Sequence, residues 1–332
     1  MYQHLDGRSI LITGGTGSFG QAAIDRILKF SDPRRFAILS RDEFKQHEMQ
    51  QRHFQEPRLR YFLGDIRDLD RLRRAFEGVE IVIHAAALKQ VEMAEYNPFE
   101  YVKTNVLGTQ NVVDAAIDTG VDQVIALSSD KACRPNNVYG ATKLCADKLL
   151  LAGNSYSGES GPKFSVVRFG NIAGTRGSVL PVFQQLAPSG TLPITDKRMT
   201  RFWITLTESV EFLVETMAIA SAAELHVPVL PSVRIVDIAK AVCPSCELHE
   251  IGLRPGEKLH EQIVDEADNP VLSSVGDRFV IASAALDNNN YLGPTADADI
   301  EGLSHSYRSD TNDQWISVDQ IRNSINETTE VS

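Results

Sequence analysis

Short, almost continuously apolar runs recur through the first half of the chain and alternate with longer segments whose apolar residues return every three or four positions. The first pattern predicts strands buried on both faces, as in a parallel sheet, and the second predicts helices that cover them. The chain is therefore expected to form an α/β doubly wound parallel sheet over residues 9–170. The six expected strands are residues 9–13, 34–41, 59–65, 80–87, 124–129 and 164–170.

The regular alternation ends after Asn171, and no stretch of linker composition sets the remaining residues apart. Helices are expected at 206–220 and 234–242, a returning strand at 224–229, and a short helix capped by Ser317 before a frayed tail at 326–332. We predict a Rossmann-type domain of residues 1–172 with a returning segment of about 203–245. Residues 173–202 and 246–332 are expected to form a smaller, intertwined lobe.

A glycine-rich turn, TGGTGSFG, joins the first expected strand to a helix. Its glycines follow a GxxGxxG spacing, which brings the backbone close to the pyrophosphate of a dinucleotide at a helix N-terminus. A tight turn without a ligand is the alternative, and the strand–turn–helix context favours the cofactor. The residues expected to contact it here are Gly14, Thr16, Gly17, Ser18, Phe19 and Gly20.

The end of the second strand indicates which dinucleotide is bound. An NAD enzyme carries Asp or Glu about 20 residues beyond the last glycine, to bind the ribose hydroxyl. Here the chain has Ser40 and Arg41, with Lys45 a turn later. A hydroxyl and a guanidinium suit a 2′-phosphate, so we predict NADP; the alternative is that Arg41 is simply solvated. Further cofactor contacts are expected from Asp65, Ile66, Ala85, Ala86 and Lys89.

Residues 127–148 carry the candidate chemistry. Tyr139 and Lys143 are four positions apart and so share one face of a helix. A nearby lysine lowers the pKa of a phenol, which can then accept a proton near neutral pH. Asp130 and Lys131 stand just before this helix at a strand end, where parallel sheets bind ligands. The alternative is a helix with a chance tyrosine and a surface Asp–Lys pair.

Asn105 lies within a long helix that is expected to begin at Asn97-Pro98. Asparagine is neutral to unfavourable in a helix interior. It is therefore expected either to hold a water or a backbone kink near the site, or to face solvent.

Charge and hydropathy exclude several classes of protein. The 332 residues include 33 Lys and Arg against 44 Asp and Glu, a net charge of -11, which gives no nucleic-acid surface. An anionic ligand therefore requires a locally basic pocket. No apolar run reaches about 18 residues, so no membrane span is expected. The chain enters a strand without a signal peptide, and we expect a cytoplasmic protein.

Four cysteines are too few for a disulfide framework in a chain of this size. Cys243, Cys246 and His249 have the spacing of metal ligands, but a structural zinc site needs four ligands and no second pair is evident. We expect free thiols and no metal.

Several stretches together resemble a known family. TGGTGSFG, HAAA, SSDK and YGATK resemble the extended short-chain dehydrogenases/reductases. SRDEFKQHEM, AAALKQVEMAEYNPFE, SSDKACRPNNVYGATKLCADKL, MTRFWITL, GLRPGEKLHE and SDTNDQW are similar to one subgroup, the inverting UDP-N-acetylglucosamine 4,6-dehydratases of pseudaminic acid biosynthesis. The similarity covers about residues 8–325. It implies an NADP-dependent lyase that is a homo-oligomer, either a dimer or a hexamer.

The resemblance also implies residue roles. Tyr139 and Lys143 match the residues of the hydride step, and Asp130 and Lys131 match the acid–base pair, with Lys131 as the base. The family more often has Thr at Ser129, and the segment CRPNN also departs from its pattern and could alter the pocket rim. A Pro-Gly turn in GLRPGEKLHE is expected to place a helix start at the substrate. The expected substrate contacts are Lys89, Ser129, Asn171, Arg176, Val179, Thr195, Arg201, Arg254 and Glu257.

Two other functions remain open. A UDP-sugar 4-epimerase of the same family would keep Tyr139 and Lys143 without needing the Asp130–Lys131 pair. A non-catalytic NADP-sensing module could dispense with Tyr139 and Lys143 as well, and their presence argues against it.

Overall fold

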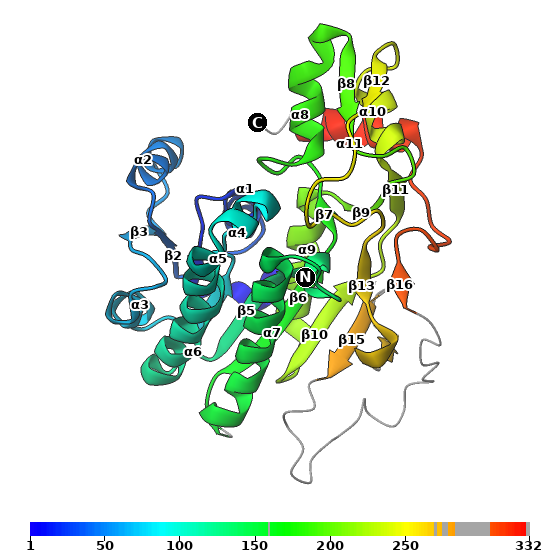
Figure 1. The fold of residues 1–332 in the computed structure, drawn as a ribbon. Helices are drawn as coiled ribbons and strands as arrows, with labels where there is room; N and C mark the ends of the chain where they lie inside the picture. The colour runs from blue at the N-terminus through cyan, green and yellow to red at the C-terminus, as the bar shows by residue number, and fades with distance from the viewer. Residues whose placement is uncertain (159, 269–270, 274–277, 283–305, 330–332) are drawn as a thin grey trace.

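A large mixed sheet forms the centre of the computed structural model, which describes residues 1–158, 160–268, 271–273, 278–282 and 306–329. Its nine strands are β1 (Ser9–Thr13), β2 (Arg35–Ser40), β3 (Leu59–Leu63), β4 (Ile81–His84), β5 (Gln123–Ser129), β6 (Lys163–Phe169), β10 (Glu224–Pro228), β14 (Val271–Ser273) and β15 (Arg278–Ala282). They lie in the order β14-β15-β10-β6-β5-β4-β1-β2-β3 (Figure 1). The seven strands from β10 to β3 are parallel, which confirms the predicted sheet, while β15 pairs antiparallel with both of its neighbours, β10 and β14.

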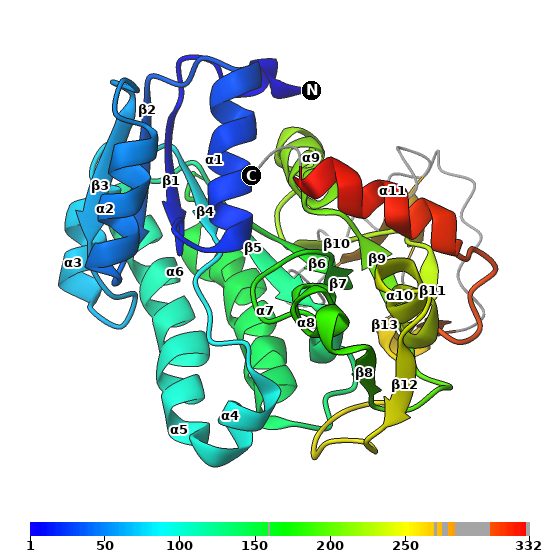
Figure 2. The same ribbon diagram turned by 90° about the horizontal axis from the view of Figure 1, so that it is seen from above.

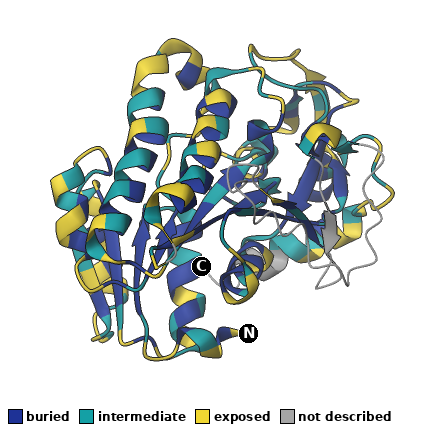
Figure 3. Ribbon diagram, turned by 90° about the horizontal axis from the view of Figure 1, so that it is seen from below, coloured by how far each residue is buried: buried dark blue, intermediate teal, exposed yellow. Residues whose placement is uncertain are grey.

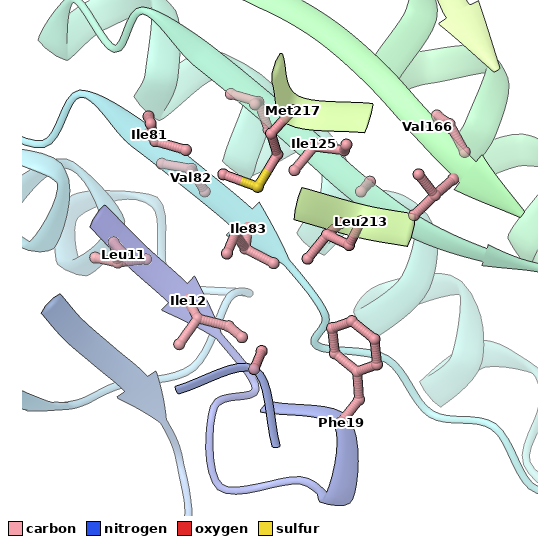
Figure 4. Close-up of a cluster of buried hydrophobic side chains, with 14 of the residues drawn as sticks. Leu11, Ile12, Phe19, Ile81, Val82, Ile83, Ile125, Val166, Leu213 and Met217 are labelled. Carbon is pink, nitrogen blue, oxygen red and sulfur yellow. The ribbon is translucent and has the colours of Figure 1, made fainter. Parts of the chain in front are cut away.

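The central strands are apolar because both of their faces are covered. Every residue of β1 and β4 is buried, and Figure 3 shows buried strands enclosed by helices whose outer faces are exposed. In Figure 4, Leu213 and Met217 pack over Ile83 and Ile125 in the core beside the sheet. Burial of this kind is the main favourable contribution to folding, and it fixes the strand ends that carry the site.

Helices cover both faces of the sheet, as the apolar periodicity predicts. α3, α6 and α7 pack side by side on one face, and α1 packs against α9 on the other (Figure 2). The helices of this part are α1 (Ser18–Phe30), α2 (Glu43–Arg52), α3 (Leu69–Phe76), α4 (Val91–Tyr96), α5 (Pro98–Tyr101), α6 (Gly108–Thr119), α7 (Val138–Ser157) and α9 (Leu206–Ile219), with short η1 (Tyr2–Leu5) and η3 (Asp130–Ala132).

The long helix expected from Pro98 is interrupted by a π-helical segment, η2 (Val102–Leu107), between α5 and α6. Asn105 lies in this segment and is buried. Its side chain accepts a hydrogen bond from Leu88 N (2.8 Å) and donates to Leu88 O (2.9 Å) and to Thr142 Oγ1 (3.1 Å). Asn105 therefore ties the loop after β4 to α7, which agrees with the expected irregularity near the site and excludes a solvent-facing role.

A second, smaller core lies beside the sheet, with Leu180, Phe183, Trp203, Ile238 and Ile321 at its centre. It is built from three helices and several short strands, which gather around α8 and α10 at the top of Figure 1. These elements are α8 (Val179–Leu186), α10 (Ile235–Val242), α11 (Val318–Thr329), β7 (Asn171–Ile172), β8 (Thr191–Ile194), β9 (Thr200–Ile204), β11 (Ser232–Arg234) and β12 (Glu247–Glu250), with short η4 (Ala187–Ser189). The strands β13 (Gln262–Val264) and β16 (Tyr307–Arg308) pair with each other and pack against the main core, with short η5 (Glu266–Asp268) following β13.

The observed division of the chain differs from the predicted one in two places. β14 and β15 fall in the range 246–332 assigned to the smaller lobe, yet they extend the large sheet. α10 falls in the segment of about 203–245 expected to return to the sheet, yet it packs in the second core. Only β10 and α9 return as expected, because β10 pairs with β6 and α9 packs on α1.

Two local predictions about helices are corrected by the structure. No helix follows the Pro-Gly turn at 255–256, because Gly256 has φ +76° and the chain stays irregular until β13. Ser317 caps α11 as expected, but the helix continues to Thr329, so the predicted tail is helical over 326–329 and otherwise lies outside the described residues.

Cys243 and Cys246 form a disulfide rather than the expected free thiols. The chain turns directly after α10, with Cys246 N donating to Cys243 O (3.3 Å), and this turn brings the two side chains together. Cys133 and Cys145 are free. Within the described ranges no three His, Cys, Asp or Glu side chains are grouped as metal ligands, and no helix there is long and apolar enough to cross a membrane.

Candidate active site

A cavity of about 870 Å³ opens between the carboxyl ends of the parallel strands and the second core. It lies where β1 and β4 are neighbours while their connections lead in opposite directions, the usual ligand position in such sheets. The walls include all the residues predicted to bind cofactor or substrate, or to react: Gly14, Thr16, Gly17, Ser18, Phe19, Gly20, Ser40, Arg41, Lys45, Asp65, Ile66, Ala85, Ala86, Lys89, Ser129, Asp130, Lys131, Tyr139, Lys143, Asn171, Arg176, Val179, Thr195, Arg201, Arg254 and Glu257.

The glycine-rich turn forms one end of the cavity. Gly14 has φ +68°, and a Cβ there would lie 2.8 Å from the Cα of Ala86, so only glycine lets the two loops touch. Arg176, predicted to bind substrate, also reaches this end. Its backbone N–H donates to Ser18 Oγ (3.2 Å) and its guanidinium to Thr16 O (2.7 Å). The loop after β7 therefore closes over the turn.

The end of β2 is polar and basic. Ser40 Oγ hydrogen-bonds Thr16 Oγ1 (2.9 Å) and accepts from Asp42 N (3.2 Å). Arg41 is half-exposed, with Nη1 3.7 Å from an Asp65 carboxylate oxygen. Asp42 caps α2 by accepting from Lys45 N, and Arg41 lines the cavity.

Four charged side chains meet at the centre of the cavity. Lys131 Nζ lies 3.0 Å from Asp130 Oδ1 and 3.3 Å from Glu261 Oε1, and Glu261 Oε1 lies 3.8 Å from Arg201 Nε. Asp130 is fully buried, Glu261 is 2% exposed and the Lys131 side chain 20% exposed. Two acids and two bases are therefore shielded from water, where charges interact strongly.

Burial and charge pull the pKa values of this group in different directions. Burial raises the pKa of Asp130, although Lys131 opposes the shift. Burial works against the Lys131 ammonium, but Asp130 and Glu261 outweigh it and raise the pKa of Lys131. Burial likewise works against the Glu261 carboxylate, but Lys131, Arg201 and Lys258 outweigh it and lower the pKa of Glu261. The two carboxylates thus favour the ammonium form of Lys131, whereas a base requires the neutral amine.

The Tyr139–Lys143 pair differs from expectation in one respect. Burial raises the pKa of Tyr139 to about 12, while Lys131 and a hydrogen bond with the Ser129 side chain act in the lowering direction. The Lys143 ammonium donates to Leu127 O (2.7 Å) in β5. The predicted lowering of the Tyr139 pKa by Lys143 is wrong, because burial of the phenol dominates.

The start of α7 is fitted tightly against the rest of the site. A Cβ on Gly140 would overlap the carbonyl oxygen of Lys131, so this glycine allows the helix of Tyr139 to lie against η3. Asn137 caps the helix by accepting from Gly140 N (2.7 Å), and its amide donates to Gly256 O (2.8 Å). Lys258 donates to Cys133 O (2.8 Å). The CRPNN segment thus forms the contact between α7 and the turn at 255–256.

Arg254 and Glu257 lie at the cavity mouth on this turn rather than at a helix start. Arg254 Nη2 is 3.0 Å from Glu257 Oε1, and its Nη1 is 3.2 Å from Glu92 Oε1 on α4. Glu257 also faces Arg201 at 3.5 Å. Burial, Arg176 and Lys131 all lower the pKa of Lys89, which shows that cations crowd this part of the cavity. An anionic ligand would relieve that crowding.

Several buried polar atoms along the cavity have no partner within the described residues: Asp130 Oδ2, Glu261 Oε2, Asn171 Oδ1, Ser178 Oγ and Trp203 Nε1. Buried polar groups normally have hydrogen bonds, so these atoms are suited to a ligand rich in hydroxyl and amide groups. The cradle of glycines and the Ser40–Arg41 pair likewise fit a dinucleotide phosphate.

Comparisons with known proteins agree with this geometry. Residues 10–283 match the family model described as "Polysaccharide biosynthesis protein". The chain belongs to this family. It is 44% identical, over 97% of its length and 98% of the relative's, to a UDP-N-acetylglucosamine 4,6-dehydratase (inverting) of Campylobacter jejuni. The similarity read from the sequence motifs is thereby confirmed.

Other members and neighbours show how the family varies. A UDP-glucose 4-epimerase of Rickettsia rickettsii is 37% identical over 85% of each chain. The X-ray structure of Pen from Bacillus thuringiensis superposes with a TM-score of 0.88 at 34% identity, covering 98% of this chain and 99% of that one. A dTDP-glucose 4,6-dehydratase from Streptomyces venezuelae, at 22% identity and a TM-score of 0.67, covers 76% of this chain and 86% of its own and shares the fold.

Sequence reasoning missed Glu261, which contacts Lys131 from another element. Glu261 directly precedes the apolar triplet that forms β13, an acidic residue next to a strand. That signal is weak, because carboxylates at the amino end of a strand are usually solvated. Its position relative to Lys131 depends on how the second core docks, which the local pattern does not encode.

Proposed function

We propose that this protein is an NADP-dependent inverting 4,6-dehydratase of UDP-N-acetylglucosamine, a carbon–oxygen lyase of the pseudaminic acid type of glycan pathway. Its product is a UDP-4-keto-6-deoxyhexosamine with the configuration at carbon 5 inverted. The observation that supports this most directly is the meeting of the Asp130–Lys131 pair with Tyr139 in one cavity, in a chain 44% identical to an enzyme of that name. We also propose that it acts in the cytoplasm as a homo-oligomer, with α6 and α7 in the interface.

The proposed roles come from the residue chemistry. The glycine-rich turn and the Ser40–Arg41 pair would hold NADP, which would supply the acceptor for a hydride from carbon 4 of the sugar and the donor that returns it to carbon 6. Tyr139 receives the proton of the 4-hydroxyl, and the ketone that results acidifies the hydrogen on carbon 5. Lys131, as the neutral amine, removes that proton, and Asp130, as the acid, protonates the departing 6-hydroxyl. Carbon 5 is then reprotonated from the opposite face.

One proton shift prepares both groups. A proton that moves from Lys131 to Asp130, across their 3.0 Å contact, yields a neutral base and a protonated acid without changing the net charge. Burial raises the pKa of Asp130, which favours its acid form. The pair thus avoids creating an uncompensated charge in a site shielded from water.

The proposed function is tested by incubating the purified protein with a panel of UDP- and dTDP-sugars and measuring the masses of the products by mass spectrometry. UDP-N-acetylglucosamine should lose one water without net formation of NADPH. A 4-epimerase, which the Rickettsia relative makes the second candidate, would give a product of unchanged mass. A cofactor-sensing module would give no product with any sugar in the panel.

Cofactor choice is expected to depend on Arg41. Arg41→Asp should weaken NADP binding by ~2–3 kcal/mol, because it removes charge-assisted hydrogen bonds to the 2′-phosphate. Titration calorimetry measures the loss, and Arg34→Asp, exposed near the opposite end of β2, is the control. Equal affinity of the wild-type protein for NAD and NADP would show that the choice of NADP is wrong.

Arg254 is expected to hold the substrate at the cavity mouth. Arg254→Ala should raise the KM for the UDP-sugar about tenfold or more, the effect of one lost charged hydrogen bond, and leave NADP affinity nearly unchanged. Steady-state kinetics and cofactor titration measure the two quantities, with Arg74→Ala, exposed on α3, as the control. An equal fall in NADP affinity would contradict the assignment of this loop to the substrate.

A further inference from the structure

We propose that Glu261 is a positioning residue of the dehydration step: it holds the Lys131 side chain from the second lobe and remains the fixed anion beside it while Asp130 gains and loses the proton. This inference rests on the proposed function, in which Asp130 and Lys131 are the acid and the base, and adds Glu261 as the residue that positions Lys131. Lys131 lies between the two carboxylates, at 3.0 Å from Asp130 and 3.3 Å from Glu261.

Glu261 is held rigidly where it can do this. Its backbone N–H donates to Ser309 Oγ (2.9 Å), and its carbonyl accepts from Ser309 N (2.8 Å). Ser309 is fully buried and hydrogen-bonds Thr200 Oγ1 (2.7 Å) on β9, the strand that also carries Arg201. The backbone of Glu261 is thus fixed by bonds that have no role in binding a ligand.

The two carboxylates next to Lys131 differ in environment. Asp130 is fully buried and burial raises its pKa, so it readily accepts a proton. Glu261 faces Arg201 as well as Lys131, and these cations keep it ionised. The two environments move the pKa values of the two carboxyl groups in opposite directions. Asp130 is therefore suited to act as the acid and Glu261 to remain an anion.

Other titratable groups near Lys131 and Glu261 also contribute to the electrostatics of this site. Tyr139 on α7 and Lys89 in the loop after β4 each interact electrostatically with Lys131. Glu257 and Lys258, on the same segment as Glu261, interact with Arg201 and with Glu261 respectively. Among these groups Glu261 is the carboxylate from outside η3 that approaches Lys131 within ion-pair distance.

The role has two consequences for the reaction. A carboxylate 3.3 Å from Nζ stabilises the ammonium that forms when Lys131 takes the proton from carbon 5, which makes Lys131 a stronger base. It also fixes the direction of a long, flexible side chain, and misplacement of a reacting group is costly in rate. Oε2 of Glu261 is buried and without a hydrogen-bond partner among the described residues, so it is free to meet the ligand.

The test replaces Glu261 by Gln, which keeps the shape and removes the charge. We expect kcat to fall about tenfold or more, with KM and NADP affinity changed about twofold or less. The pH–rate profile should also move to lower pH. Loss of a nearby negative charge weakens proton binding by the Asp130–Lys131 pair, so both limbs of the profile shift in the acid direction.

If Glu261 had a purely structural role, its replacement would lower the rate at every pH without moving the limbs of the pH–rate profile. Glu261→Asp keeps the charge with a shorter reach, and its limbs should lie between those of the wild type and of the Gln variant. If Glu261→Gln does not fold, the comparison of Glu261→Asp with the wild type decides the question: limbs displaced to lower pH support the role, and limbs that do not move overturn it. The control is Glu266→Gln, exposed and five residues further along, which should leave the profile unchanged.

A measurement without substrate separates this inference from the proposed function. The titration of Lys131 is followed by NMR of ¹³C-labelled lysine side chains and assigned with the Lys131→Arg variant. Glu261→Gln should lower the pKa of Lys131. A wild-type protein that forms no dehydrated product would refute the proposed function and leave this titration valid. Unchanged Lys131 titration, unchanged limbs, or an effect confined to KM would overturn the role of Glu261.

Discussion

Lys131→Ala should lose water from UDP-N-acetylglucosamine ~10²–10⁴-fold more slowly than the wild type, the range typical for loss of a general base. The reason is that Ala leaves no group at the strand end that can remove the proton from carbon 5. Cofactor binding should be largely spared, and slow oxidation at carbon 4 should persist, since Tyr139 and Lys143 remain. Product mass and the absorbance of reduced cofactor measure these two steps separately.

Heavy water gives the same prediction an isotopic readout. The wild-type product should carry solvent deuterium at carbon 5, and Lys131→Ala should suppress this incorporation together with the loss of water. Lys148→Ala, exposed on α7, is the matched control and should behave as wild type. Near-normal elimination by Lys131→Ala, or wild-type product without deuterium at carbon 5, would refute the assignment. If Lys131 only paired with phosphate, KM would rise while the rate at saturating substrate stayed unchanged.

Tyr139→Phe should slow the reaction ~10²–10⁴-fold at the earlier, hydride step. Without the phenol oxygen no group is placed to take the proton of the 4-hydroxyl, so neither the ketone nor exchange at carbon 5 should appear. This variant thus differs from Lys131→Ala, which retains slow oxidation. Tyr156→Phe, exposed on the same helix, is the control.

The pH dependence distinguishes this role of Tyr139 from a packing role. Burial raises the pKa of Tyr139 to about 12, which favours the protonated phenol at neutral pH. The wild-type rate of oxidation at carbon 4 should therefore increase with pH as the phenolate becomes more populated. Substantial oxidation by Tyr139→Phe, with the same pH dependence as the wild type, would contradict the assignment.

The sequence predicts most of what depends on local pattern. Burial and backbone geometry determine apolar runs and glycine spacing. The sequence therefore predicts the strand of residues 9–13, the glycine-rich turn and the strand end at Asp130. The antiparallel strand β15 could not be predicted in this way, because its place in the sheet between β14 and β10 depends on pairing with β10, far away in the sequence. The same holds for Glu261, which meets Lys131 only once the second core has docked.

Electrostatic states are harder to predict than positions. The spacing of Tyr139 and Lys143 correctly places both residues in the cavity, but it does not reveal that Lys143 bonds to Leu127 O. The turn at 255–256 shows a related limit. Pro-Gly followed by charged residues is compatible with a helix start, and the positive φ of Gly256 excludes it only in the folded chain.

The side chain of Asn137 joins two parts of the molecule whose tasks differ. Its carbonyl oxygen caps the helix that presents Tyr139, and its amide holds the turn that presents Arg254. A ligand that orders this turn therefore also stabilises the beginning of the helix, and a change in the helix is transmitted to the turn with the same free energy. Under the proposed roles of Arg254 and Tyr139, substrate capture and alignment of the phenol would be reciprocally linked equilibria rather than independent events.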